Sequence, residues 1–216
     1  MPVDLIDYWR SLKPNAKYHP DDEKVLKRLK GGFFNLRCLP FCFFGPLKTA
    51  PVVLLYLSPG LNQFDLDEAR SAVGRRRVAI ARAGEEPIPT MDQHAPIWSW
   101  WKQRVKAFGN PEELRSKIAV LNIGAYHSRS FDDYSFLASL PSSRVCLDWA
   151  QSVLFRQAIA GDRVVICLRS APFWGLKPGE SYGRALFAPA VTRSGHMKNG
   201  AMRNRIVRAV QRAVSG

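Results

Sequence analysis

The chain has 216 residues, 46% of them hydrophobic, which suits one globular domain with a large core that needs no disulfide staples. Its 32 Lys and Arg residues outnumber its 18 Asp and Glu residues, and the formal net charge of +14 favours an acidic partner, most often nucleic acid. No apolar run approaches the roughly 18 residues of a membrane span, and the first residues lack a signal peptide, so we expect a cytoplasmic protein without membrane contact.

Apolar runs and segments of helical periodicity alternate along the chain. The runs lack apolar–polar alternation, so they predict strands that are covered on both faces. In chain order we expect a polar helical segment at 1–31, a loop at 32–51, a strand at 52–57, a helix at 63–74, a loop at 83–97, a helix at 98–108, a strand and polar loop at 118–128, an amphipathic helix at 143–160, a strand and loop at 163–175, a strand and loop at 184–196, and a helix at 201–214. We treat 1–216 as a single domain in which 1–42 is a helical and loop extension.

Strands that alternate with helices predict an α/β fold with a mainly parallel sheet. In such a sheet, ligands bind outside the carboxyl ends of the strands. Polar loops are expected at those ends at 58–62, 126–128, 169–174 and 188–196, so these loops predict the site. The chain contains neither the phosphate-binding motif GxxxxGK[ST] nor the dinucleotide motif GxGxxG, and we expect no cofactor.

Several of these segments carry a family resemblance. FFGPLKTAPVVLLYLSPGLN at 43–62 resembles the first motif of the uracil-DNA glycosylase superfamily, in which an apolar strand runs into Asn-Pro-Gly or Asp-Pro. IAVLNIGAYHS at 118–128 looks like the strand that ends in a base-reading Asn, while VVICLRS and ALFAPAVTRSGH fit the later strands and the closing motif. The resemblance covers about residues 43–200 and is similar to a bacterial branch with altered catalytic motifs.

The resemblance implies a three-layer αβα fold with a mainly parallel four-stranded central sheet. It also implies DNA binding and hydrolysis of the N-glycosidic bond of a damaged or deaminated base, as in DNA repair. Two positions depart from the family pattern. Ser58 stands where active members place an Asp or Asn that orients or activates water, and Ala188-Pro189-Ala190 stands where many members place His-Pro-Ser. The scaffold is therefore expected to persist with altered chemistry.

Four side chains are candidates for catalysis. Asp65 is the nearest carboxylate that can replace the missing acid. Ser58 either positions a water or caps the turn that follows it, and the absence of a GxSxG elbow argues against a hydrolase nucleophile. His127 and His196 stand in strand-end loops, where each either stabilises the departing base as an anion or is hydrogen-bonded to its own backbone.

The expected substrate contacts come from the same loops. The amide of Asn122 either offers a donor and an acceptor to a base edge or satisfies loop backbone. Gly60 lets the backbone approach a ligand closely, and we anticipate a positive φ there. Phe64 either stacks on a base or packs beside the core, and the tryptophans at 98, 100 and 101 are interpreted as packing, with Trp100 facing away from the other two. The substrate-binding candidates are Pro59, Gly60, Leu61, Asn62, Phe64, Asn122, Tyr126, Ser128, Arg169 and Asn199.

Basic residues and cysteines complete the candidates. The nucleic-acid contacts expected from charge are Arg75, Arg76, Arg77, Arg193 and Lys198, on a monomer that binds DNA. We expect no metal. The resemblance places Cys38, Cys42 and Cys146 roughly where iron–sulfur ligands occur in some members, but Cys167 lies within an expected strand, which argues against a cluster.

Two other functions stay open. The first is a non-catalytic DNA-binding module that has kept the pocket and lost the chemistry, as the changes at Ser58 and Ala188 would allow. The second is a hydrolase of nucleotides or another small phosphorylated ligand, with Arg169 as the clamp for the anion.

Overall fold

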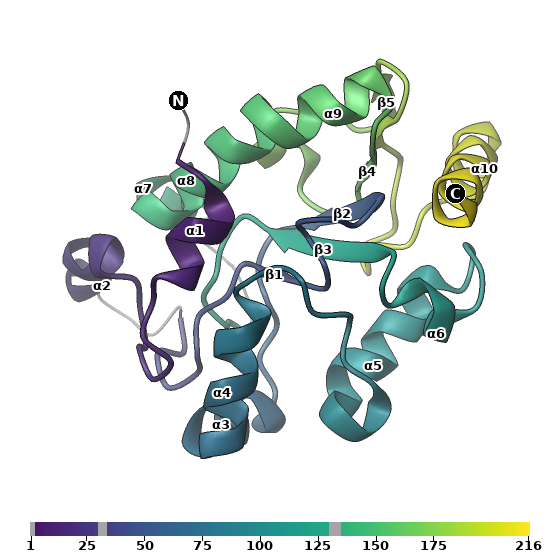
Figure 1. The fold of residues 1–216 in the computed structure, drawn as a ribbon. Helices are drawn as coiled ribbons and strands as arrows, with labels where there is room; N and C mark the ends of the chain where they lie inside the picture. Colours follow the sequence, from purple (N-terminus) through teal and green to yellow (C-terminus); the bar gives the residue numbers. More distant parts are fainter. Residues whose placement is uncertain (1–2, 30–33, 130–134) are drawn as a thin grey trace.

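The computed structural model describes residues 3–29, 34–129 and 135–216, and its α/β fold is built on one six-stranded mixed sheet (Figure 1). The four inner strands run parallel to one another, and the two edge strands are antiparallel to their neighbours. Across the sheet the order is β1 (Phe43–Phe44), β3 (Ile118–Asn122), β2 (Val52–Tyr56), β4 (Val164–Cys167), β6 (Leu186–Ala188) and β5 (Glu180–Tyr182).

The expectation of a four-stranded sheet is therefore corrected. The four expected strands are present as the inner strands β3, β2, β4 and β6. The edge strands β1 and β5 were missed because they have two and three residues, too few to show a period, and lie in segments broken by Pro and Gly. Each pairs along only one of its sides, so the mixed sheet ends in short edges.

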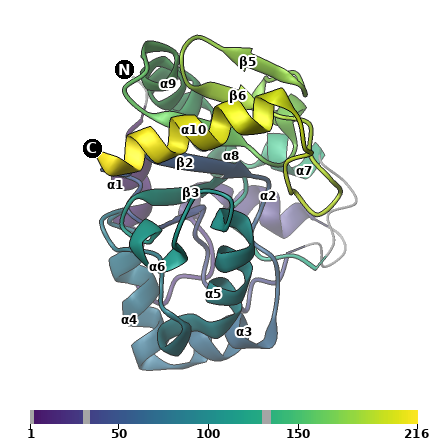
Figure 2. The same cartoon turned by 90° about the vertical axis from the view of Figure 1, so that its right-hand side faces the viewer.

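Helices cover both faces of the sheet, as the apolar character of the inner strands requires. Along β2, Val53 and Leu55 join one core cluster, whereas Val52, Leu54 and Tyr56 join the other. The first cluster is closed by α1 (Leu5–Arg10), α8 (Pro141–Trp149) and α9 (Phe155–Ala160), with a π-helical turn between the last two. The second is closed by α5 (Met91–Val105) and α10 (Ala201–Ser215), which crosses in front of the strands in Figure 2.

The N-terminal segment is part of the main core. Leu5 and Trp9 of α1 are fully buried in the same cluster as the sheet. The short turn η1 (Pro20–Asp22) and α2 (Glu23–Arg28) follow, so the expected helical character of this region is confirmed over part of its length. Residues 30–33, which the expected helical segment and loop include, lie outside the described residues.

Helix boundaries differ from the expectation where caps intervene. The expected helix at 63–74 is two helices, α3 (Gln63–Arg70) and α4 (Ala72–Ala81), because Ser71 takes an extended conformation and its hydroxyl accepts the Gly74 N–H at 2.9 Å. Helix α5 begins at Met91, inside the expected loop at 83–97. The remaining helices are α6 (Pro111–Leu114), α7 (Ser135–Ser139) and the short 3-10 helix η3 (Ala171–Trp174). None of the described helices is long and apolar enough to cross a membrane.

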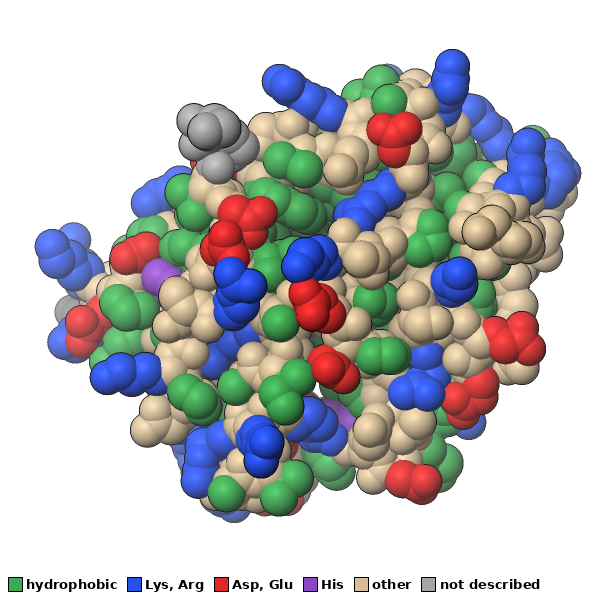
Figure 3. Space-filling view, viewed as in Figure 1, with side chains coloured by type: hydrophobic (Ala, Val, Ile, Leu, Met, Phe, Trp, Pro, Cys, Tyr) green, Lys and Arg blue, Asp and Glu red, His purple; other side chains and the backbone are tan. Residues whose placement is uncertain are grey.

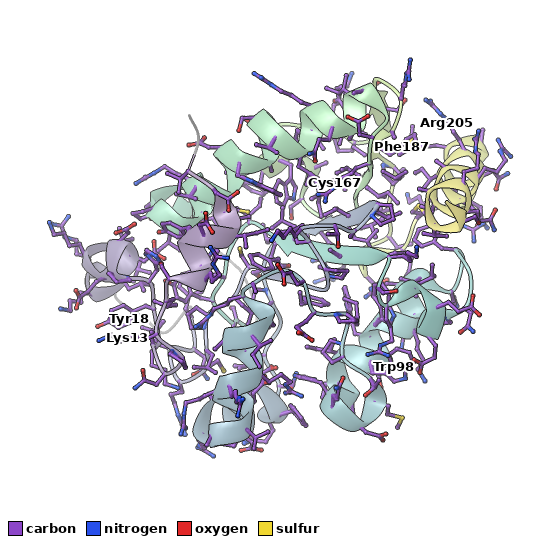
Figure 4. All side chains as sticks on the ribbon, viewed as in Figure 1. Lys13, Tyr18, Trp98, Cys167, Phe187 and Arg205 are labelled. Atoms are coloured by element: carbon purple, nitrogen blue, oxygen red, sulfur yellow. The ribbon has the colours of Figure 1, made fainter. Side chains whose placement is uncertain are left out.

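The last helix forms as its periodicity predicts. Ile206 and Val210 of α10 are buried against the sheet. In Figure 4, Arg205 of this helix lies beside Phe187 of β6, with its guanidinium carbon 5.2 Å from the ring centre. Trp98 of α5 points into the same side of the core. The basic residues of α10 therefore belong to a helix whose apolar face packs against the sheet.

The chain path indicates a ligand position at the carboxyl ends of two inner strands, β2 and β3. From β2 the chain passes through α3 to α6 on one side of the sheet before it returns as β3, whereas from β3 it passes through α7 to α9 on the other side (Figure 1). Adjacent parallel strands whose connections leave toward opposite faces mark the usual ligand position in α/β sheets. The carboxyl ends of β2 and β3 are therefore the expected position of a ligand site.

Candidate functional site

A cavity of about 790 Å³ lies at the carboxyl ends of β2 and β3. The loops after the two strands are tied together there, because Gly124 N–H donates to Leu57 O at 2.8 Å and His127 Nδ1 donates to Gly60 O at 2.7 Å. The cavity brings together eleven residues predicted from sequence: Ser58, Pro59, Gly60, Leu61, Asn62, Asp65, Asn122, His127, Ser128, Arg169 and Arg193.

Other predicted residues do not line this cavity. Tyr126 is buried beside the N-terminal segment, where its hydroxyl donates to Asp22 and accepts the His19 N–H. Phe64 lies on α3, with its ring 4.2 Å from that of His94. The remaining predicted residues outside the lining are His196, Asn199, Arg75, Arg76, Arg77 and Lys198.

An aromatic wall that sequence reasoning missed forms one side of the cavity. Phe41 and Phe44 come from the segment before β2, and Trp100 comes from α5. The ring of Trp100 makes edge contacts with Phe44 at 5.8 Å and with Tyr56 at 5.1 Å. Trp98 and Trp101 are buried in the second core cluster, whereas Trp100 is part-buried and packs beside it. The expected separation of Trp100 from the other two along the helix was the available signal. These rings offer flat apolar surface to a ligand.

Asn122 presents an unused amide to the cavity. It ends β3 with a side chain on the same face of the sheet as Tyr56, its register partner on β2. Its backbone is held on both sides, because its N–H donates to Cys42 O and its carbonyl accepts the thiol of Cys146. The residue is 3% exposed, and Nδ2 has no hydrogen-bond partner among the described residues. A buried donor without a partner is costly, so this amide is suited to a ligand.

Asp65 supplies a buried carboxylate to the same cavity. Asn62 and Asp65 cap α3 reciprocally, with Asn62 N–H donating to Asp65 Oδ2 at 2.8 Å. His127 Nδ1 lies 3.5 Å from the same carboxylate oxygen. Burial alone would raise the pKa of Asp65, but interactions with the imidazoles of His127 and His94 outweigh it and hold the pKa well below its usual value. The carboxylate is therefore ionised at neutral pH.

His94 is a buried residue that the sequence did not single out. It has non-helical backbone angles inside α5, and its Nδ1 accepts the Ile97 N–H at 3.2 Å, so it caps the main part of that helix just before Pro96. Because Nδ1 accepts, the ring proton is on Nε2. This Nε2 lies 3.7 Å from both Asp65 Oδ1 and Glu68 Oε2. The cap thus fixes a tautomer that directs its N–H toward two carboxylates.

Asp65, Glu68 and His94 are the one group among the described residues whose three candidate ligand atoms lie within 4.8 Å of one another. Two features oppose a metal ion there. His94 Nε2 carries the proton that a metal would displace, and the guanidinium of Arg77 already binds Glu68. The His94 Nε2–H and the Arg77 guanidinium therefore occupy the places near these carboxylates that a metal ion would need.

The cysteines are free thiols in buried positions. Burial raises the pKa of Cys38 to about 11 and that of Cys167 to about 12, and it raises the pKa of Cys42 well above its usual value. Metal clusters bind thiolates, which these surroundings disfavour. Within the described part of the chain, Cys38, Cys42 and Cys146 do not bring three ligand atoms together.

His196 does not line the cavity but is hydrogen-bonded to Arg104, which does. Arg104 of α5 lines the cavity, stacks its guanidinium on Trp100 at 5.5 Å and donates from Nη1 to His196 Nε2 at 2.6 Å. Burial first, and then the charges of Arg104 and Lys106, lower the pKa of His196, so the imidazole is a neutral acceptor at neutral pH. The nitrogen that faces Arg104 therefore has no proton to give to a leaving group.

The structure separates the predicted arginine run into different roles. Arg77 binds Glu68 and donates to the carbonyl of Gln93, and Arg75 donates to the carbonyls of Ala69 and Arg70. Arg76 is exposed. In Figure 3, Lys and Arg side chains spread over the whole visible face instead of forming one patch. Charge clustering in sequence thus overstated the contacts available from α4.

Two backbone expectations are corrected or explained. Gly60 does not have a positive φ, and a Cβ added there would meet nothing within 4 Å, so its backbone is ordinary and faces open space. Ala188, at the position where the family resemblance places a His, is fully buried in β6 within the apolar core. It offers no polar group to the cavity.

Comparison with known proteins gives no match among family models, curated proteins or solved structures.

Proposed function

We propose that the protein binds DNA, takes one nucleotide out of the stack into the cavity, and hydrolyses the N-glycosidic bond of a damaged or deaminated base. In this proposal the fold is a three-layer αβα variant of the uracil-DNA glycosylase architecture, acting as a monomer. The observation that carries the proposal is the unpaired amide of Asn122 in an aromatic-walled cavity that also holds the ionised carboxylate of Asp65.

The base would lie against the aromatic wall. Extruded bases are held by stacking on aromatic rings and by hydrogen bonds to their Watson–Crick edge. Phe41, Phe44 and Trp100 supply the rings, and Asn122 supplies a donor and an acceptor. The volume of about 790 Å³ lies within the roughly 300–1,000 Å³ of small-molecule sites and can hold more than a base.

Asp65 would act on the sugar. When the C1′–N bond breaks, its electron pair leaves with the base and the sugar becomes cationic. A low pKa makes Asp65 a weak base but a permanent negative charge, which stabilises that cation and orients a water. The water oxygen bonds to C1′, and its proton passes to Asp65 as that bond forms. The N–H of Asn122 stabilises negative charge on the departing base.

The test is a glycosylase assay on oligonucleotides that carry uracil, hypoxanthine, xanthine or a mismatch. We expect strand scission after alkali for at least one base, and Asp65→Asn should slow it by about 10²-fold or more. Asp67→Asn is the matched control, because Asp67 lies on the same helix and is exposed. Absence of scission on the whole panel would contradict the enzymatic part of the proposal.

One observation favours a second candidate, a non-catalytic DNA-binding module. Asp65 Oδ2 already accepts the Asn62 N–H and lies near His127, so the carboxylate is well occupied by the protein itself. Ser58 and Ala188 replace the polar groups that active members of the resembling family carry. Tight binding of the panel without scission would support this module.

DNA affinity should fall with salt, because each neutralised phosphate releases a counterion. Of the predicted basic contacts, Arg76, Arg193 and Lys198 are exposed, whereas Arg75 and Arg77 bind the protein. Substituting Gln for one of the exposed three should reduce the slope of log K against log salt by about 1. A flat salt response in wild type would contradict a phosphate-binding face.

A further inference from the structure

One side of the cavity carries hydrogen-bond donors and positive charge that the protein itself does not use. Tyr56 ends β2 and is 7% exposed, and its hydroxyl has no hydrogen-bond partner among the described residues. The ring is fixed by its edge contact with Trp100 and by its place in the sheet. Tyr56 lines the cavity, and its hydroxyl is a donor that the described part of the protein does not use.

Arg104 approaches the same region with a fixed orientation. Its guanidinium is stacked on Trp100 and bonded to His196, while its Nε is buried without a hydrogen-bond partner in the described structure. Arg169 follows β4 and lines the cavity as well. In the described ranges, no carboxylate lies within ion-pair distance of either guanidinium.

The positive charges of Arg104 and Arg169 are near enough to Tyr56 to affect the pKa of its hydroxyl. Burial raises the pKa of Tyr56 above its usual value, and the charges of Arg104 and Arg169 oppose that rise. The three groups thus act on one another, although each comes from a different element of the fold. Unpaired buried donors and uncompensated cations cost free energy, and a ligand that supplies acceptors and negative charge removes the cost.

We propose that Tyr56, Arg104 and Arg169 form an oxyanion subsite that holds a phosphate group of a nucleotide. A tetrahedral phosphate offers several acceptors at once, and guanidinium groups bind it through paired N–H donors. The subsite deepens the proposed function and rests on it in one respect, the assignment of the phosphate to a nucleotide whose base lies against Asn122. The phosphate belongs either to a nucleic-acid strand or to a free nucleotide, two sources with the same chemistry.

The test is calorimetric titration of wild type, Tyr56→Phe and Arg169→Gln. The probes are inorganic phosphate, uridine 5′-monophosphate, uridine and a uracil-containing single-stranded oligonucleotide. Arg208→Gln is the matched control, because Arg208 is exposed on α10, lies outside the cavity lining and loses the same charge. We expect each cavity variant to weaken binding of phosphate-bearing probes at least tenfold, and the control to bind like wild type.

The pattern across probes identifies the source of the phosphate. If the cavity variants bind the mononucleotide more weakly than wild type, the site takes free nucleotides. If they bind only the oligonucleotide more weakly, the site takes a phosphate of a strand. Wild-type binding of every probe by both cavity variants would overturn the subsite, as would an equal loss in Arg208→Gln. Phosphate binding without base release would uphold the subsite while the glycosylase proposal fails. Base release with an unchanged KM in both variants would uphold the glycosylase proposal while the subsite fails.

Folding gives a second readout. Tyr56→Phe removes only a hydroxyl that has no partner in the described structure, so its melting temperature should equal or exceed that of wild type. A clear fall in melting temperature would mean that the hydroxyl is needed by the protein, and the subsite would lose its basis.

Discussion

The two sides of the cavity differ in how their polar groups are satisfied. Around Asp65, both carboxylates have partners: Asp65 accepts the Asn62 N–H and lies 3.5 Å from His127 Nδ1, and Glu68 binds Arg77. Around Asn122, the amide lacks a partner among the described residues, and so does the Tyr56 hydroxyl. The first side stabilises the fold whether or not a ligand is present, whereas the second is complete only with a ligand. Mutations on the two sides should therefore have opposite signatures.

The largest effect should come from Asp65→Ala, which breaks the paired side. Its removal leaves the Asn62 N–H without its acceptor and takes away one of the two carboxylates that lie 3.7 Å from His94 Nε2. Loss of one member of a buried ionic group costs about 3–5 kcal/mol in the free energy of unfolding. Urea denaturation measures it. Asp67→Ala should cost less than about 0.5 kcal/mol, because that side chain is exposed. Similar losses in the free energy of unfolding for the two variants would contradict a stabilising role for the contacts of Asp65.

The unpaired side should show the reverse pattern in Asn122→Ala. Ligand binding should weaken by about 1–3 kcal/mol, because the ligand group that pairs with the amide is left unsatisfied. The free energy of unfolding should change by less than about 1 kcal/mol, since Nδ2 has no partner to lose among the described residues. Titration and urea denaturation of the same preparation test both halves. A large stability loss with unchanged binding would identify Asn122 as a structural amide.

Acid should weaken the paired side selectively. The pKa of Asp65 is lowered in the folded protein, so its contribution is fully present above the unfolded pKa of about 4 and is lost as pH falls toward the folded value. Wild type should therefore lose stability below pH 4 faster than Asp65→Asn, by at most about 1.4 kcal/mol per pH unit. Urea denaturation at several pH values gives both slopes. Equal dependence of stability on pH in wild type and Asp65→Asn would show that these contacts do not lower the pKa of Asp65.

The smallest effect on folding should come from Gly60→Val, at the mouth of the cavity. Its φ is not positive and the added Cβ would meet nothing within 4 Å, so the free energy of unfolding should change by less than about 0.5 kcal/mol. The branched side chain should nevertheless weaken ligand binding, because Gly60 lines the cavity. A melting temperature far below wild type would show a backbone constraint at this turn.

The sequence predicted the parts of the fold with a strong local pattern. The four inner strands are apolar runs of sufficient length, and the turn after β2 was found from the rule about strand ends. Asn122, the last residue of β3, was singled out by the family resemblance. Strands β1 and β5 were too short to recognise. The start of α5 was hidden because His94 caps it, a use of His that propensity does not anticipate.

The site was only half predicted, for a physical reason. Residues at strand ends can be found from sequence, because the fold class places them at one edge of the sheet. Phe41, Trp100 and Arg104 reach the cavity from a preceding segment and from a helix, so only tertiary packing brings them there. The Arg75–Arg77 run failed differently, because two of its guanidinium groups are used by the protein itself.

The central claim is that the unpaired side of the cavity receives a base. The most direct measurement compares the affinity of wild type for two single-stranded oligonucleotides that differ at one position. One carries a hydrolysis-resistant uracil, hypoxanthine or xanthine nucleotide, and the other carries an abasic analogue. The account predicts at least tenfold tighter binding of one base-bearing strand and loss of that difference in Asn122→Ala. Equal affinity of wild type for every base-bearing strand and the abasic strand would contradict it.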